Sequence, residues 1–184
     1  MRLIGELLRE AQASNSKDPP YFMRAADKQE LREQWILGRF AGNYNKIAPR
    51  NMKYAKHLNP PEPDFEVFDD GKHWILDAEV TEALDADRKR DLELRRESKG
   101  FKFVPENDYF PVLQQRISSK CSKSYSRDTI LIIYFNIFSS LYDLSDSPGY
   151  FNKGFFSSLQ IPQKCGLSQI WLLESDCSKI LQLA

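Results

Sequence analysis

The sequence predicts a single α/β domain in which helices flank a mixed central sheet. Residues 64–68 and 73–82 alternate apolar and polar side chains on either side of Asp69-Asp70-Gly71, and this pattern is typical of an antiparallel β-hairpin. The run from Thr129 to Phe138 is apolar on both faces, β-branched and short, which indicates a fully buried strand in the middle of the sheet. Helical periodicity before and after the hairpin supplies the flanking helices.

The remaining elements follow from periodicity and turn chemistry. Apolar residues recur with helical spacing in the first thirteen residues, again from about Ala26 to Tyr44, and again after Asp108 to about Lys123. We expect the other segments to be a marginal charged helix at 83–99, mostly loop at 139–166, a strand at 169–173 (QIWLL) and a short terminal helix at 178–183.

Length and composition agree with one folded domain. The chain has 184 residues, of which 41% are hydrophobic and 12% aromatic, so it can bury a core. Its 26 basic residues balance 26 acidic ones, so any contact with nucleic acid has to be local. The longest apolar run is too short to cross a bilayer, and charges interrupt the apolar N-terminus. We expect a cytoplasmic protein without a membrane contact.

The sequence lacks the signatures of several common sites. Its two histidines form no zinc-binding pattern, and neither a GxxxxGK[ST] nor a GxGxxG loop is present. The three cysteines have neither metal-binding spacing nor a CxxC pair, so we expect reduced thiols.

A basic segment lies between Asn43 and His57. It contains four cations, two tyrosines and no acidic residue, so it could follow a phosphate backbone while Tyr44 and Tyr54 stack on bases. The alternative is a solvated loop that happens to be basic. The four cations are Lys46, Arg50, Lys53 and Lys56.

The hairpin separates acidic from apolar residues. If Asp70-Gly71 is a two-residue turn, Asp64 lies directly opposite Asp77, and paired residues share a face. One face is then wholly apolar: Phe65, Val67, Trp74, Leu76, Ala78 and Val80. The other carries Asp64, Glu66, Ile75, Asp77, Glu79 and Thr81.

The acidic face predicts a metal site. Carboxylates directly opposite each other repel by about 0.2–1 kcal/mol, and a hard cation such as Mg²⁺ or Mn²⁺ would compensate. Asp64, Asp77 and Glu79 are close enough in this register to converge on one ion. The alternative is an ordinary solvated sheet face. A three-residue turn would shift the register and move Asp64 to the other face.

These residues resemble a known family. Pro63-Asp64, followed by Ile75 to Thr81 (ILDAEVT), resembles the signature of the PD-(D/E)xK, or restriction-endonuclease-like, nucleases. The resemblance implies an α-β-β-β-α-β core over about residues 27–138. Residues 1–26 would then be a helical extension, and 139–184 an extension that adds a strand.

The resemblance also implies roles. Asp64 and Glu79 would be metal ligands, with Val80 offering its carbonyl, but Thr81 stands where the family has lysine. The missing charge could come from Lys120 or Lys72. In another alignment, Asp77 is the acid and Glu79 takes the lysine position. A further acid would come from the preceding helix, as Glu33 or Glu30, and Gln114 and Lys120 would point to the site.

The sequence thus leads to two functional hypotheses. The first is a metal-dependent phosphodiesterase that cleaves nucleic acid, DNA in preference to RNA, by attack of a metal-bound water; a homodimer is left open. The alternative is a non-catalytic protein of the same fold that binds DNA or protein, in which Thr81 marks the loss of chemistry. An unrelated α/β protein with an acidic sheet face is a third reading.

Overall fold

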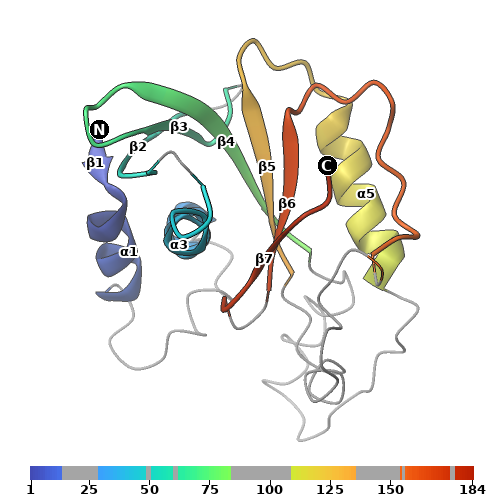
Figure 1. The fold of residues 1–184 in the computed structure, drawn as a ribbon, viewed down its shortest axis with the longest axis horizontal. Helices are drawn as coiled ribbons and strands as arrows, with labels where there is room; N and C mark the ends of the chain where they lie inside the picture. The colour runs from blue at the N-terminus through green and yellow to red at the C-terminus, as the bar shows by residue number, and fades with distance from the viewer. Residues whose placement is uncertain are drawn as a thin grey trace, which may run out of the picture.

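The computed structural model describes residues 1–13, 29–48, 51–59, 62–83, 109–135, 154, 156–174 and 177–184. These residues form an α/β fold with one mixed sheet, as the sequence predicts (Figure 1). The helices are α1 (Ile4–Ala13), α3 (Gln29–Tyr44) and α5 (Tyr109–Cys121). The strands are β1 (Arg2–Leu3), β2 (Tyr54–His57), β3 (Phe65–Phe68), β4 (Trp74–Glu82), β5 (Thr129–Tyr134), β6 (Gln169–Leu173) and β7 (Ile180–Gln182).

The strands lie in the sheet in the same order as in the chain. Neighbours from β1 to β4 are antiparallel, β4, β5 and β6 are parallel, and β7 returns antiparallel to β6. Helix α5 lies in the crossover between β4 and β5, because parallel neighbours cannot be joined by a tight turn. The order α3, β2, β3, β4, α5, β5 is compatible with the expected core.

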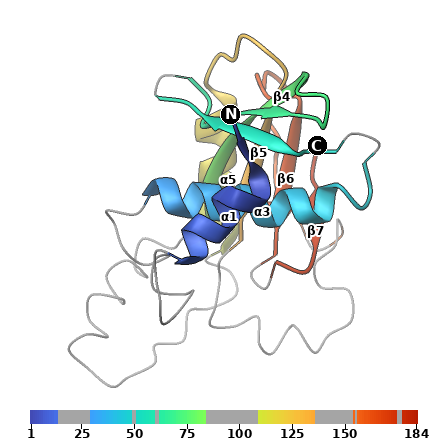
Figure 2. The ribbon, with the colours of Figure 1, turned by 90° about the vertical axis from the view of Figure 1, so that its left-hand side faces the viewer.

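Helices cover both faces of the sheet. Figure 1 shows α1 and α3 on one side of β5 and α5 on the other, and Figure 2 shows α1 and α3 lying together in front of the strands. Strand β5 is buried along its whole length. Its residues Ile130 and Ile132 pack in the core under α1 and α3, whereas Leu131 and Ile133 pack with α5. This two-sided burial explains why the strand is apolar on both faces from Ile130 onward.

Some predicted elements differ from the observed ones. Residues 180–182 form strand β7 and not part of a terminal helix, because the edge of β6 presents backbone groups that need a partner. The end of the basic segment forms strand β2 and not a loop. Arg2 and Leu3 form β1 ahead of the first helix. The expected helix at 83–99 and the loop at 139–153 lie outside the described residues, apart from Ala83.

The prediction of three reduced cysteines is wrong. Cys121, at the end of α5, forms a disulfide with Cys165, while Cys177 is not part of a disulfide among the described residues. The partners are 44 residues apart, and no spacing rule pairs cysteines at that distance. Only the packing of α5 beside the segment that leads into β6 brings them together.

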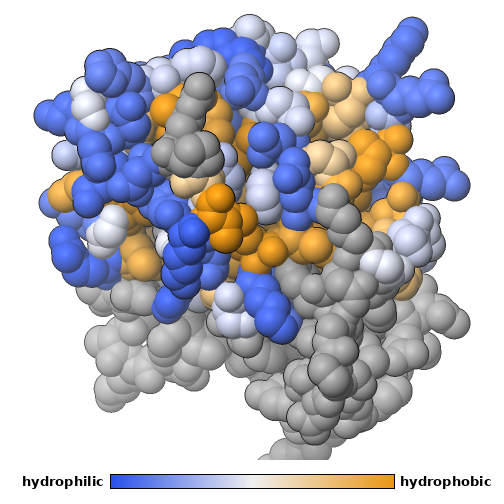
Figure 3. Space-filling view, in the orientation of Figure 1, coloured by the Kyte–Doolittle hydropathy of each residue, from blue (hydrophilic) through white to orange (hydrophobic). Residues whose placement is uncertain are grey.

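The surface is mixed. In Figure 3, hydrophilic residues surround patches where hydrophobic residues reach the surface. The exposed large hydrophobic residues of the described part are Met1, Ile47 and Trp74. None of the described helices combines the length and the apolar character needed to cross a membrane.

Candidate functional site

The hairpin turn differs from the prediction but keeps the acids together. Lys72 has a positive φ of 61°, its N–H bonds to the carbonyl of Asp69, and the N–H of Asp69 bonds to the carbonyl of His73. Residues 70–72 therefore form a three-residue loop that ends in a left-handed residue. This loop shifts the register by one position, which alone would move Asp64 to the opposite face.

A β-bulge compensates for the turn. Phe68 pairs with Trp74 but Val67 pairs with Leu76, so Ile75 is an extra residue on β4. The turn and the bulge each shift the pairing of β3 with β4 by one residue, so the total shift is two residues. Because side chains alternate between faces with a period of two, each residue of β3 beyond the bulge again shares a face with the residues predicted for it. Glu66, and not Asp64, now lies opposite Asp77.

The bulge also corrects the predicted position of Trp74. Ahead of the bulge, this residue moves from the apolar face to the acidic one, where its Nε1–H donates to Asp77 Oδ1 at 2.8 Å. Its side chain is 37% exposed, although the sequence predicts a core position. The sequence pattern did not reveal the bulge.

Asp64 lies where β3 begins, beside β4. Its Oδ2 accepts a hydrogen bond from the backbone N–H of Val80 at 2.7 Å. Burial, followed by the negative charges of Glu33 and Glu79, raises the pKa of Asp64 from 3.8 to about 6, while the Val80 N–H and Lys120 act in the opposite direction. Burial and the neighbouring acids therefore disfavour the ionised form of Asp64.

Glu79 is almost completely buried, with 2% of its surface exposed, on the β4 face that packs toward α5. Its Oε1 accepts hydrogen bonds from Lys120 Nζ and, at 2.8 Å, from Lys123 Nζ. A buried carboxylate needs such partners, because an unpaired one would cost several kcal/mol, of the order of 3–5. The bond to Glu79 also raises the pKa of Lys123.

Lys123 is a site residue that sequence reasoning missed. It follows Lys120 by three residues and lies two positions beyond the end of α5, where its backbone N–H donates to the carbonyl of Lys120 at 3.2 Å. That spacing is the signal that could have identified it. Lys123 is 48% exposed, against 20% for Lys120, and is therefore the more accessible of the two.

Glu33 approaches from α3. Its Oε1 accepts a hydrogen bond from Gln29 Nε2 at 2.7 Å, and its Oε2 lies 3.5 Å from His57 Nε2, another residue that sequence reasoning did not place in the site. The charge of Glu33 contributes to the raised pKa of Asp64. Glu30 instead accepts a hydrogen bond from Gln34. Between the two acids, the structure therefore places Glu33 in the Asp64 group.

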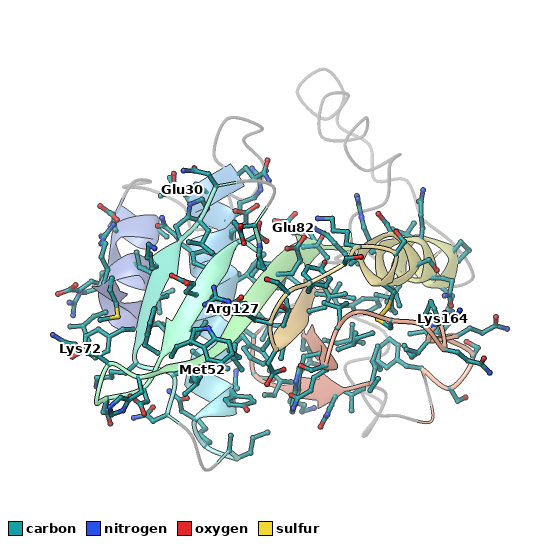
Figure 4. All side chains as sticks on the ribbon, turned by 90° about the horizontal axis from the view of Figure 1, so that it is seen from above. Glu30, Met52, Lys72, Glu82, Arg127 and Lys164 are labelled. Atoms are coloured by element: carbon teal, nitrogen blue, oxygen red, sulfur yellow. A yellow bond between two sulfur atoms is a disulfide. The ribbon has the colours of Figure 1, made fainter. Side chains whose placement is uncertain are left out.

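Asp77 belongs to a second charged group with Glu66. Arg127 donates to Glu66 Oε1 at 2.7 Å and lies 3.1 Å from Asp77 Oδ2, and its guanidinium stacks 5.2 Å from the ring centre of Trp74. Figure 4 shows Arg127 over the hairpin strands. Arg127 lowers the pKa of Glu66, whereas burial raises that of Asp77. The two acidic groups have different cations, so we leave Asp77 out of the metal set.

The other candidates for the motif have distinct positions. Thr81 pairs with Ile133 in the parallel register and is half-buried. Lys72 lies at the turn, with its Nζ 5.8 Å from the ring centre of Tyr54, and Figure 4 shows it at the opposite end of β4 from Glu82. Of the two lysines considered as replacements, the structure therefore places Lys120, and not Lys72, against Glu79.

The proposed nucleic-acid contacts divide into two groups. Lys46, Lys53 and Lys56 are exposed, with Lys46 bonded to Asn43 and Lys56 to Glu66. Arg50 lies outside the described residues.

Two candidates have structural contacts instead. The side-chain amide of Gln114 donates to the backbone oxygen of Gln160 at 2.7 Å and accepts from its backbone N–H at 2.8 Å. Tyr44 packs against Phe40 and Trp171, so it is not available to stack on a base.

The donor set suits a hard cation. Mg²⁺ takes one or two carboxylates together with water and phosphate oxygens, and Asp64 and Glu79 supply two carboxylates. Burial, and after it the charges of Glu33 and Glu79, raise the pKa of Asp64, so its ionised form is disfavoured in the folded chain. Among the described residues, no group of three or more histidine, cysteine or acidic side chains is arranged to hold a metal. Any ion there would therefore keep much of its water.

No protein-family model matches the chain, and no curated protein is significantly similar to it in sequence.

Proposed function

We propose that this protein is a metal-dependent phosphodiesterase that acts on nucleic acid, with DNA favoured over RNA. The supporting observation concerns Asp64 and Glu79, which carry the resemblance to the PD-(D/E)xK nucleases: the charges of Glu79, Glu33 and Lys120 act on Asp64, and Lys120 donates to Glu79. Separate elements of the chain supply these four groups: the start of β3, β4, α5 and α3.

The residues have complementary roles in this proposal. Asp64 and Glu79 hold a divalent ion, Mg²⁺ or Mn²⁺, which would supply positive charge to the phosphate. Lys120 is mostly buried and pairs with the carboxylate of Glu79. Lys123 is half-exposed and can turn to a phosphate oxygen. Its ammonium group would then supply the positive charge that the motif lysine provides and Thr81 lacks.

Exposed lysines near the site fit a negatively charged substrate. Lys53 and Lys56 are exposed around β2, which is hydrogen-bonded to β3 near Asp64. They can attract the phosphate backbone without a basic charge on the whole protein, since screening limits such attraction to about 10 Å.

A second candidate is a non-catalytic binding protein of the same architecture. Two observations favour it: Thr81 replaces the motif lysine, and Glu79 Oε1 already accepts two ammonium groups. In this case the ion pairs are purely structural, and the exposed lysines serve binding alone.

Calorimetric titration with Mg²⁺ and Mn²⁺ tests the metal site. We expect the wild type to bind and Asp64→Asn to lose at least about tenfold in affinity, as loss of one charged ligand implies. Asp77→Asn is the matched control, because it removes the same charge from the Arg127 group and should bind as the wild type does. Equal affinities of the wild type and Asp64→Asn would refute the metal site.

A nuclease assay then separates the two functions. With plasmid and single-stranded DNA as substrates, the phosphodiesterase hypothesis expects metal-dependent cleavage by the wild type and none by Glu79→Gln. A mobility shift without cleavage, unchanged in Glu79→Gln, would support the binding protein instead.

A further inference from the structure

The disulfide lies next to the two site lysines in the chain. Cys121 is the last residue of α5, directly after Lys120 and two residues before Lys123. Both lysines donate to the same oxygen of Glu79. The end of a helix frays readily, because its last carbonyl groups lack partners within the helix. A covalent bond at Cys121 acts on the turn that presents the lysines.

Non-covalent contacts surround the same turn. At Gly166, next to Cys165, a Cβ atom would lie 2.7 Å from the backbone oxygen of Lys123, so only glycine allows this approach. The hydroxyl of Tyr125 donates to the backbone oxygen of Lys120 at 3.4 Å. The segment around Cys165 therefore packs directly on the backbone that carries both lysines.

The rest of α5 is attached independently. Gln114 bonds to the backbone of Gln160, and Leu113 and Ile117 are fully buried in the core. Opening the disulfide should therefore leave most of the helix in place and release only its end.

We infer that the Cys121–Cys165 disulfide is a positioning element that holds Lys120 and Lys123 on Glu79, and that its reduction by a dithiol releases them. This inference deepens the proposed function, and only its activity measurement rests on that function. The arrangement makes the lysine pair responsive to redox conditions.

The redox step is ordinary thiol–disulfide exchange. Cys165 is half-buried whereas Cys121 is 3% exposed, so a thiolate of the dithiol attacks the sulfur of Cys165. Cys121 leaves as a thiolate and takes a proton. The second thiol of the reagent then displaces Cys165, so that two electrons pass to the protein and the reagent becomes a disulfide.

Lysine labelling tests the inference without reference to activity. The native protein is treated with an amine-reactive reagent, with and without dithiothreitol, and modification at each lysine is measured by mass spectrometry. We expect Lys120 and Lys123 to react roughly tenfold faster after reduction, the factor expected for loss of one hydrogen bond to a charged group. Exposed Lys46 is the internal reference and should not change.

The outcomes are distinct. Unchanged labelling of Lys120 and Lys123 in the reduced protein would overturn the inference. Equal acceleration at Lys46 would also overturn it, because the disulfide would then hold the whole fold rather than this turn. The double variant Cys121→Ser with Cys165→Ser should label as the reduced wild type does and ignore dithiothreitol. If dithiothreitol still accelerates its labelling, the disulfide is not the cause.

Activity provides a second measurement. If the protein cleaves DNA, reduction should lower kcat by roughly tenfold while KM changes less, because the two lysines are then no longer held at the carboxylate next to the reacting phosphate. A loss confined to KM would contradict the positioning role. If neither form cleaves DNA, the proposed function fails while the labelling result still decides the inference.

Discussion

Replacing Asp64 by Asn should stabilise the metal-free protein. The carboxyl group has a pKa of about 6 in the folded chain against an ordinary value of 3.8, because burial and then the charge of Glu33 penalise its ionised form. At pH 7 the negative charge of Asp64 therefore lowers the free energy of unfolding. Asparagine has nearly the same shape, carries no charge, and can still accept the hydrogen bond from Val80 N–H.

The size of the effect follows from the pKa difference. Each pKa unit corresponds to 1.36 kcal/mol, so the shift from 3.8 to about 6 makes ionised Asp64 destabilising by about 3 kcal/mol at pH 7. The folded chain binds the proton more tightly than the unfolded chain, so this contribution to stability falls as pH rises from about 4 to about 6 and is constant above. The advantage of Asp64→Asn should thus be about 3 kcal/mol at pH 7 and below about 1 kcal/mol at pH 4.

Denaturant unfolding at both pH values measures this difference. Adding Mg²⁺ at pH 7 should narrow it, because the ion binds folded wild type and gives about 2.7 kcal/mol at one hundred times the dissociation constant. The reasoning is refuted if Asp64→Asn is less stable than the wild type at pH 7 without metal. A gain that is the same at pH 4 and pH 7 would also refute it.

Three further predictions concern the charges and the disulfide. Reduction of Cys121–Cys165, which closes a loop of 44 residues, should lower the free energy of unfolding by about 4 kcal/mol in the chain-entropy model, measured by urea unfolding with and without dithiothreitol; an unchanged midpoint would contradict this. Lys120→Ala and Lys123→Ala each leave Glu79 one cation, so the double variant should lose more stability than the sum of the two, about 3–5 kcal/mol in total; additivity in a double-mutant cycle would argue against a shared partner. Arg127→Ala should raise the pKa of Glu66 toward its ordinary value in an NMR titration, since Arg127 is the main cause of its lowering, and should leave metal affinity unchanged; a weaker metal site in this variant would mean that the two acidic groups are coupled.

Local patterns in the sequence were sufficient for most of the sheet. The strand at 169–173 was predicted with the bounds that the structure has. The β5 run was recognised because a strand that is buried on both faces carries apolar residues on both. The separation of acidic from apolar residues on β3 and β4 also held, although the turn and register behind it did not.

The lysines and the disulfide show where such patterns end. Glu79 is 41 residues from Lys120 and 44 from Lys123, and the spacing of the two lysines in the sequence does not show what they contact. The bulge at Ile75 has no marker in the sequence, since neither glycine nor proline accompanies it. Trp74 was therefore assigned to the core although it contacts Arg127 at the surface.

The sequence by itself determined which residues alternate, which are buried on both faces, and that acids gather on one side of a hairpin, because these properties depend on neighbours within a few positions. The tertiary structure alone decided that Asp64 joins Glu79 rather than Asp77, that Lys120 and Lys123 rather than Lys72 contact Glu79, and that Cys121 meets Cys165. The first outcome follows from the turn and the bulge between β3 and β4, and the other two arise because α5 packs across the parallel strands.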